Sequence, residues 1–381
     1  MTALTDAPAQ TLPRQLVAVV FAATCVIVGL IWDISWHMSI GRDTFWTPAH
    51  LVIYTGGAVA GLVSGYEVLR RSFWSATPPT DGVTVWRVFN GPFGGWLAIW
   101  GAVAMLTSAP FDDWWHNAYG LDVKIISPPH ALLALGFIAI LSGAVALAAA
   151  AQSRHAGTPE RSAAPWLVAY ASGLVLTIIA IFCTEFTDRP LMHRSLFYVV
   201  SAIAFPFALV AAGRSTRLRY PATASAAVYT LIMCAQVWIL PAFAATPRLG
   251  PIRQMITHMV PLNFPLLLIV PAFVIDVVLQ RTASRSAWQR AALVGTLFVV
   301  TLALVQWPFA NFLMSDASRT ALFRTDNFPY MMPADWPVVT GTFHVEPLQG
   351  TVRGFGLALV LGILSARLGL ARGEWLRTVQ R

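Results

Sequence analysis

Residues 131–151 read ALLALGFIAILSGAVALAAAA, an apolar run without a single charged side chain. A helix needs about 20 such residues to cross the roughly 30 Å of hydrocarbon in a bilayer. Similar runs recur along the chain, separated by short polar segments. The whole sequence is 57% hydrophobic and only 11% charged, whereas a soluble domain has about 25% charged residues. The sequence therefore predicts a polytopic membrane protein whose partner is the lipid bilayer.

The predicted architecture is an all-α bundle of about ten transmembrane helices in a single integral-membrane domain, residues 1–381. Residues 1–151 form two tandem helical hairpins, residues 152–381 supply the other helices, and the segment 316–350 caps the bundle. Because the number of helices is even, both termini lie on one side of the membrane. The predicted helices span residues 15–36, 48–70, 93–115, 128–151, 165–186, 192–212, 222–244, 256–279, 288–312 and 351–370.

Basic residues are distributed unevenly between the two sides of this bundle. More than half of the 25 lysines and arginines lie on the side of the termini, among them Arg70, Arg71, Arg214, Arg217 and Arg219. The positive-inside rule then places both termini in the cytoplasm, so we predict a multi-pass protein of the bacterial inner (plasma) membrane. The formal charge of +8 comes from short clusters between apolar runs. Such a distribution excludes nucleic acid as a partner.

Two predicted hairpins share one pattern of acidic residues, histidines and turn residues. The common frame is Asp-x3-His-x3-Gly-x-Asp, followed four or five positions after the second aspartate by Ser/Thr-Pro-x-His. Agreement at so many positions in the same order indicates an internal duplication. The first copy consists of Asp33, His37, Gly41, Asp43, Thr47, Pro48 and His50, and the second of Asp112, His116, Gly120, Asp122, Ser127, Pro128 and His130.

The spacing within the frame predicts where these side chains lie. Asp33 and His37 are four residues apart, so they share one face of a helix. Gly41 suits the left-handed turn that ends a helix, and Thr47 can cap the next helix. His50 then falls in the first turn of that helix. Each hairpin should thus bring one carboxylate and two imidazoles to the same depth at the non-cytoplasmic rim of the membrane.

This combination of groups predicts metal binding. A carboxylate with two imidazoles suits copper, zinc or iron, and leaves coordination positions open for water or oxygen. The predicted ligands are Asp33, His37, His50, Asp112, Asp113, His116 and His130. In the alternative interpretation the repeat keeps its acidic and turn residues for the turns alone, and the histidines are amphipathic anchors at the interface.

Further polar residues on the same predicted side extend the candidate list. Asp43 and Asp122 lie in the turns, where each can orient a ligating imidazole or cap the turn itself. Ionisable residues at the membrane rim are unfavourable without a partner. Additional candidate ligands are therefore Glu185, Asp188, His193, His258 and His344.

The spacing Asp33-x3-His37-x12-His50 resembles the metal-binding motif of the C subunit of the copper membrane monooxygenases, the particulate methane and ammonia monooxygenase family. The second copy, from Asp112 to His130, is one residue longer. The resemblance covers about 20 residues per copy and does not extend over the chain. It implies an intramembrane copper site of one carboxylate and two imidazoles, and by extension oxygen-dependent oxidation of an apolar substrate.

Two functions follow from the predicted metal sites. One is an oxygen-dependent oxidoreductase that acts on a small apolar substrate. The other is a copper-binding or copper-delivery protein, with a periplasmic metal carrier as its partner. Haem ligation and a structural role beside other membrane subunits are further alternatives. Transport is less well supported, because Gln236 and Asn263 are the main polar residues at mid-membrane depth.

Overall fold

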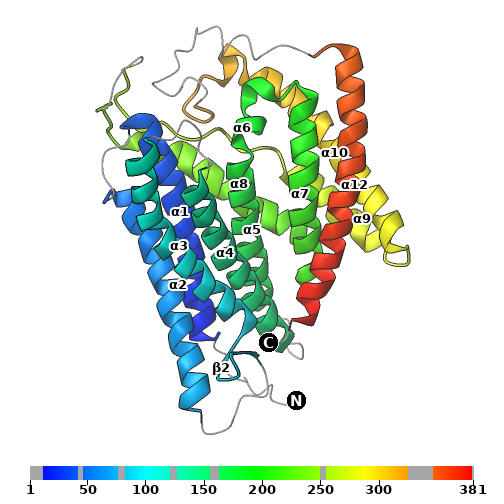
Figure 1. Ribbon diagram of the computed structural model, residues 1–381. Coiled ribbons are helices and arrows are strands. Elements are labelled where there is room, and N and C mark those ends of the chain that lie inside the picture. Colours follow the sequence, from blue (N-terminus) through cyan, green and yellow to red (C-terminus); the bar gives the residue numbers. More distant parts are fainter. Residues whose placement is uncertain are drawn as a thin grey trace, which may run out of the picture.

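The computed structural model describes residues 12–41, 46–75, 82–120, 127–154, 163–248, 255–324 and 346–379. Within these residues it shows an α-helical bundle in which nine helices are long and apolar enough to cross a membrane (Figure 1). The prediction of a polytopic membrane helix bundle is confirmed. The main helices are α1 (Arg14–Ser39), α2 (Pro48–Phe73), α3 (Phe93–Tyr119), α4 (Pro128–Arg154), α5 (Ala164–Phe182), α6 (Thr184–Thr187), α7 (Ser195–Ser215), α8 (Pro221–Ile239), α9 (Ile269–Arg281), α10 (Ala287–Leu313) and α12 (Leu348–Thr378).

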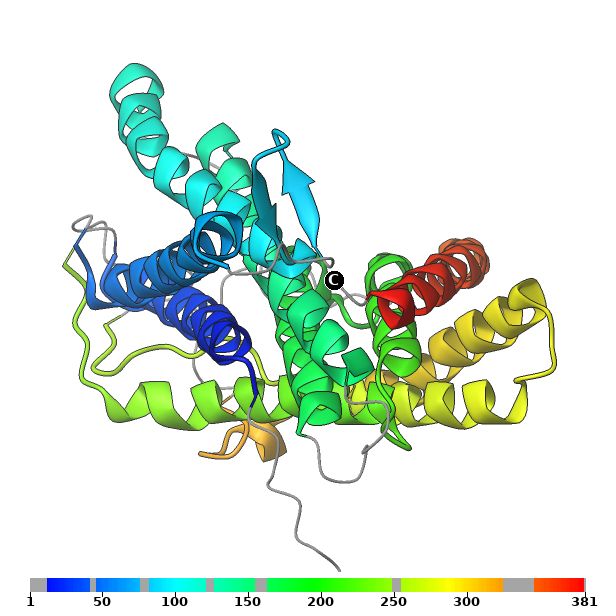
Figure 2. The same cartoon turned by 90° about the horizontal axis from the view of Figure 1, so that it is seen from below.

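Helix α1 begins and helix α12 ends at the same end of the bundle, which we call the terminal end (Figure 1). The opposite end, where α1 ends and α2 begins, is called the site end. Helix α1 packs against α2 and helix α3 against α4, and these pairs form the two predicted N-terminal hairpins. Helix α5 contacts α1, α4, α7 and α8 and so joins the hairpins to the rest of the bundle (Figure 2).

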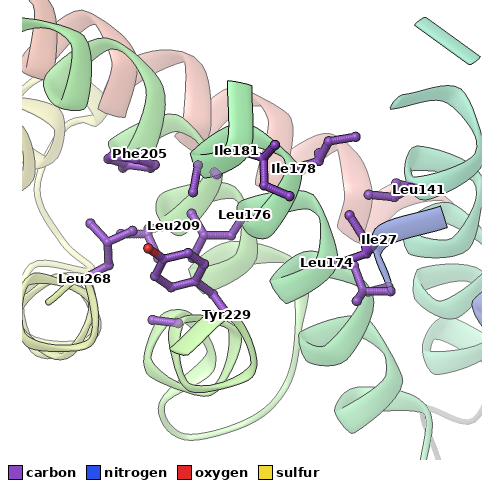
Figure 3. Close-up of a cluster of buried hydrophobic side chains, with 14 of the residues drawn as sticks. Ile27, Leu141, Leu174, Leu176, Ile178, Ile181, Phe205, Leu209, Tyr229 and Leu268 are labelled. Atoms are coloured by element: carbon purple, nitrogen blue, oxygen red, sulfur yellow. The ribbon is translucent and has the colours of Figure 1, made fainter. Parts of the chain in front are cut away.

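The core is a continuous set of buried aliphatic and aromatic side chains. Ile27 and Leu141 lie beside Leu174 on one side of α5, whereas Phe205 and Tyr229 lie on its other side (Figure 3). These side chains are almost fully buried. Because lipid is as apolar as the core, helices in a membrane associate through close packing and polar contacts rather than by excluding water.

A short β-hairpin at the terminal end was not predicted from the sequence. Strands Val83–Val85 (β1) and Phe89–Gly91 (β2) pair in antiparallel register between α2 and α3. Trp86 and Arg87 supply positive φ angles at the turn, which side chains other than glycine rarely adopt. The hairpin is fixed to the bundle because Ser72 Oγ accepts a hydrogen bond from the Asn90 backbone N–H at 2.9 Å.

The largest difference from the predicted helices concerns residues 256–279. Only Ile269–Arg281 is helical there, and the chain before it, from residue 255, is non-helical. Pro261 and Pro265 explain this, because each lacks a backbone N–H and disfavours helical geometry in the residue before it. The membrane crossing at this point therefore combines a non-helical half with a short helix.

Side chains from neighbouring helices satisfy the backbone of this non-helical segment. Ser39 Oγ accepts from the Val260 N–H at 2.8 Å, and Gln236 Oε1 accepts from the Leu262 N–H at 2.8 Å. Further along the segment, the Tyr229 hydroxyl accepts from the Leu266 N–H at 2.9 Å. Gln306 Oε1 accepts from the Leu267 N–H at 2.9 Å. Non-helical backbone at membrane depth is tolerated only when protein or water satisfies it, and these side chains do so here.

Candidate metal centre

The first hairpin brings its three predicted ligands together at the site end. Asp33 and His37 lie on the last turns of α1, and His50 lies in the first turn of α2. Asp33 Oδ1 is 3.6 Å from His37 Nε2 and 3.1 Å from His50 Nε2. One ligand atom from each residue lies within 4.8 Å of the other two. A metal with bonds of about 2.1 Å holds neighbouring ligand atoms roughly 3 to 4 Å apart, so the three groups fit a single ion.

The orientation of the carboxylate also fits a cation. Asp33 Oδ1 is buried and forms no hydrogen bond among the described residues, although two imidazole nitrogens face it. A buried carboxylate oxygen without a hydrogen bond is unfavourable. The three ligand atoms lie within 4.8 Å of one another, and a cation bound among them would satisfy the oxygen together with both nitrogens.

The turn residues of the frame act as the sequence predicted. Thr47 is the N-cap of α2, and its Oγ1 accepts a hydrogen bond from the His50 N–H at 3.2 Å. Gly41 follows the end of α1 with a φ of 98°, in the region that glycine adopts without strain. The cap places His50 in the first turn of α2, beside the last turn of α1.

The second hairpin has nearly the same geometry. Asp112 Oδ1 is 3.2 Å from His116 Nε2 on α3 and 3.6 Å from His130 Nε2 on α4. The two imidazole rings are 6.5 Å apart between centroids, the same separation as between His37 and His50 in the first hairpin. Ser127 repeats the cap of Thr47, since its Oγ accepts from the His130 N–H at 3.5 Å.

A backbone carbonyl orients one imidazole of the second set. His116 Nδ1 lies 2.9 Å from the carbonyl oxygen of Gly120. A carbonyl only accepts, so Nδ1 carries the proton and the lone pair of Nε2 points toward Asp112. Metal-bound histidines are commonly fixed in this way through their other ring nitrogen. Gly120, with a φ of 81°, therefore ends α3 and also holds His116 in the tautomer that can ligate.

The packing within the two hairpins is also equivalent. An added Cβ at Gly56 would lie 2.8 Å from the Ala22 carbonyl oxygen, and one at Gly136 would lie 2.9 Å from the Gly101 carbonyl oxygen. These positions correspond in the frame, as residue 56 matches residue 136 and residue 22 matches residue 101. The duplication therefore includes a close contact between the helices as well as the ligand residues.

Tyr54 belongs to the site although the sequence analysis did not select it. It lies one turn after His50, and the two rings are 5.9 Å apart between centroids. The charges of both Asp33 and Asp112 act on its hydroxyl, which places Tyr54 near both sets. The frame does not reveal it because the matching residue of the second hairpin is Ala134. Its spacing of four residues from His50 was the only available signal.

Asp113 does not join the second set. Its Oδ2 accepts a hydrogen bond from Asn117 Nδ2 at 3.3 Å on the exposed surface of α3. Asp112, one residue earlier, is the carboxylate that faces the histidines. The predicted roles of Asp43, Asp122 and His344 stay predictions, because these residues lie outside the described residues.

Three of the additional candidates, Asp188, His193 and His258, contact residues outside the two sets. Asp188 Oδ1 accepts hydrogen bonds from the Arg189 N–H and the Asn263 side chain, each at 2.7 Å, and burial raises the pKa of this carboxyl. His193 is 2% exposed with its ring edge-on to Trp307, and burial lowers its pKa. His258 is exposed and contacts Thr257 Oγ1 at 2.8 Å. These contacts do not form a further three-ligand group among the described residues.

Two sets of one carboxylate and two imidazoles thus lie at the site end, one on each hairpin. Among the described residues, Asp33, His37 and His50 are the one group whose three ligand atoms all lie within 4.8 Å of one another. A metal held by three protein ligands would keep positions open for water or another small ligand. No protein-family model, no curated protein and no solved structure matches the chain.

Proposed function

We propose that this chain is an integral-membrane metalloprotein that binds copper through Asp33, His37 and His50. The observation that carries the proposal is the buried Asp33 Oδ1, which faces both imidazoles without a hydrogen bond. Copper suits this ligand set best because imidazole binds it strongly, while iron and zinc are the alternatives. The positive-inside bias of the sequence would orient the site end toward the periplasm.

We propose that Asp112, His116 and His130 bind a second metal ion. The support is the repeated geometry, including the oriented His116 ring and the matching close contact at Gly136. The exposed histidine differs between the sets: His37 on α1 is 40% and His50 23% exposed in the first, whereas His116 is 13% and His130 on α4 36% exposed in the second.

The proposed activity is oxygen-dependent oxidation of a small apolar substrate. Open coordination positions allow a copper ion to bind oxygen, and the resemblance of the first copy to the copper membrane monooxygenases favours this chemistry. Insertion of one oxygen atom into a C–H bond releases the other as water and consumes two electrons and two protons. An external electron donor, such as a membrane quinol or another membrane subunit, must supply them.

The exposure of His37 favours a second candidate function, the receipt and delivery of copper. A ligand that reaches solvent can pass its metal to a soluble carrier, and at the periplasmic face the partner would be a metal carrier. This candidate predicts metal exchange without consumption of oxygen.

One set of measurements separates these functions. The purified protein is loaded with copper, its metal content is determined, and oxygen uptake is followed with a quinol donor and short alkanes or alkenes. Substrate-dependent oxygen uptake that is lost in His37→Ala supports oxygen-dependent oxidation of an apolar substrate. Transfer of copper to a chelating carrier without oxygen uptake supports delivery. Copper content that is unchanged in both His37→Ala and His130→Ala would contradict the metal sites altogether.

A further inference from the structure

Arg290 is a buried cation at the terminal end of the bundle, far from the histidines. It lies in the first turn of α10 and is 8% exposed. Its Nε and Nη2 atoms are buried and have no hydrogen-bond partner among the described residues. A guanidinium presents five N–H donors and remains charged in proteins. Donors of this kind are unfavourable when buried without an acceptor.

The position of Arg290 in its helix adds to this cost. The N-terminal turn of a helix carries a partial positive charge, so a cation there is repelled rather than stabilised. Ser286 and Gln289 form a capping box with each other, and Arg290 takes no part in it. An anion is the kind of group that would favour both this helix terminus and the guanidinium.

The neighbouring charged groups leave an excess of positive charge. Arg214 on α7 donates to Glu374 on α12 from both Nε and Nη2, which engages that carboxylate. Among the described residues, Arg214 and Glu374 are charged groups whose charges act on the Arg290 guanidinium. The buried carboxylate of Asp276 on α9 accepts from the backbone of Ala222 and Thr223, so it is engaged at the start of α8.

Arg367 on α12 adds a further cation beside α10. Its guanidinium lies over the ring of Trp288, 5.6 Å from the centroid, and its Nε is also buried without a hydrogen-bond partner. Helices α10 and α12 approach closely here, because a Cβ at Gly295 would lie 2.5 Å from the Gly362 backbone. Two guanidiniums with unused donors, Arg290 and Arg367, thus belong to adjoining helices at one end of the bundle.

The surroundings of these arginines point to a lipid as the source of the anion. Trp288 is 57% exposed and lies next to the start of α10. Tryptophan in membrane proteins is enriched at the level of the lipid headgroups. Basic pockets between transmembrane helices at this level bind anionic phospholipids, and guanidinium groups form paired hydrogen bonds with phosphate.

We propose that the phosphate of an anionic phospholipid binds among α7, α10 and α12 at the terminal end and accepts hydrogen bonds from Arg290 and Arg367. The bound headgroup supplies the negative charge that the start of α10 lacks. This site is separate from the metal centres, and its test does not depend on whether they are loaded.

The test compares thermal unfolding of the full-length protein in nanodiscs of phosphatidylcholine alone and of phosphatidylcholine with phosphatidylglycerol. A third sample contains phosphatidylcholine nanodiscs with inorganic phosphate. The variant is Arg290→Gln, and its matched control is Arg285→Gln, which removes an exposed arginine at the same end. If Arg290→Gln fails to fold, Arg367→Gln is tested in the same three samples.

Phosphatidylglycerol should raise the Tm of the wild type and of Arg285→Gln by several degrees, and that of Arg290→Gln by less than half as much. Native mass spectrometry should find the retained phosphatidylglycerol on the wild type and lose it in Arg290→Gln. An equal rise in Tm for Arg290→Gln, or for Arg367→Gln in its place, would overturn the proposal. So would a rise of the same size with inorganic phosphate alone, because the anion would then not be a lipid.

Discussion

Asp33 on α1 faces His50 on α2, with 3.1 Å between Oδ1 and Nε2. This contact joins two helices at the point where the chain turns between them, and the same carboxylate oxygen lies 3.6 Å from His37. A carboxylate that faces two imidazoles from two helices links the fold of the hairpin to its chemistry. The strength of metal binding should depend on this oxygen more than on any other single atom of the site.

Asp33→Asn should weaken copper binding by about 10- to 100-fold, because an amide oxygen is neutral and a poorer ligand than a carboxylate. The side chains are nearly isosteric, so the hairpin should still fold. Copper titration of the purified variant, followed by competition with a chelator of known affinity, measures the change. An affinity equal to that of the wild type would show that Asp33 is not a ligand.

The two adjacent aspartates of the second hairpin provide a matched pair. Asp112→Asn should reduce metal binding at the second site, whereas Asp113→Asn should leave it unchanged, because the hydrogen bond that Asp113 forms among the described residues is to Asn117 on the surface of α3. The number of metal ions bound per chain, measured by elemental mass spectrometry on each purified variant, distinguishes the two variants. Equal losses in both would mean that the carboxylate of the second site is wrongly assigned.

The close contacts inside the hairpins predict opposite effects of two glycine substitutions. Gly136→Ala should destabilise the protein by about 1 to 3 kcal/mol, since its Cβ would lie 2.9 Å from a carbonyl oxygen. Gly65→Ala should be neutral or stabilising by up to about 1 kcal/mol, because its Cβ meets open space and alanine favours helix. Thermal unfolding in detergent measures both. Similar effects of the two substitutions would argue against the packing described for α3 and α4.

The non-helical segment before α9 should depend on Gln236. Gln236→Leu leaves the Leu262 N–H and carbonyl without their partners at membrane depth, which should cost about 1 to 3 kcal/mol. Thr230→Val on the same helix is the control, because in the described part of the chain the Thr230 hydroxyl donates to the carbonyl of Ala226 in its own helix. A loss of stability no larger than that of the control would contradict the role of Gln236.

Glu346 predicts a pH-dependent contribution to stability. The Ser195 hydroxyl and backbone N–H hold the pKa of this carboxyl below its usual range, with a distance of 3.0 Å from the N–H to Oε2. The contribution is present above the usual glutamate pKa of about 4.3 and is lost as the pH falls through the depressed value. Glu346→Gln should therefore be less stable than the wild type at pH 7, and the difference in Tm should shrink at low pH. A difference that stays constant down to pH 3 would contradict this.

The sequence was sufficient for the features that depend on local spacing. Apolar runs of membrane-spanning length predicted the helices, and the spacing from Asp33 to His37 predicted their shared face. The caps at Thr47 and Ser127 were also predicted, because capping involves residues three positions apart. These features arise within a few residues of one another along the chain.

Features that depend on distant contacts were not predicted. The break before α9 combines two prolines with acceptors from α1, α8 and α10, and the partners of Val260 and Leu262 cannot be inferred from the local sequence. The charges of Asp33 and Asp112 both act on the Tyr54 hydroxyl. Because these aspartates belong to different hairpins, the sequence around Tyr54 does not indicate this. Arg290 resembled any other basic residue at a helix end until packing showed that it is buried.

The most direct test of the central claim is X-ray absorption spectroscopy at the copper edge on the loaded protein, with metal content measured on the same sample. We predict two copper ions per chain in the wild type, with imidazole nitrogens and a carboxylate oxygen at about 2.0 to 2.2 Å. The double variant His37→Ala with His50→Ala should hold one. The claim that each hairpin binds one copper ion would be contradicted if the wild type held no copper or showed sulfur ligands. It would also be contradicted if the double variant retained both ions.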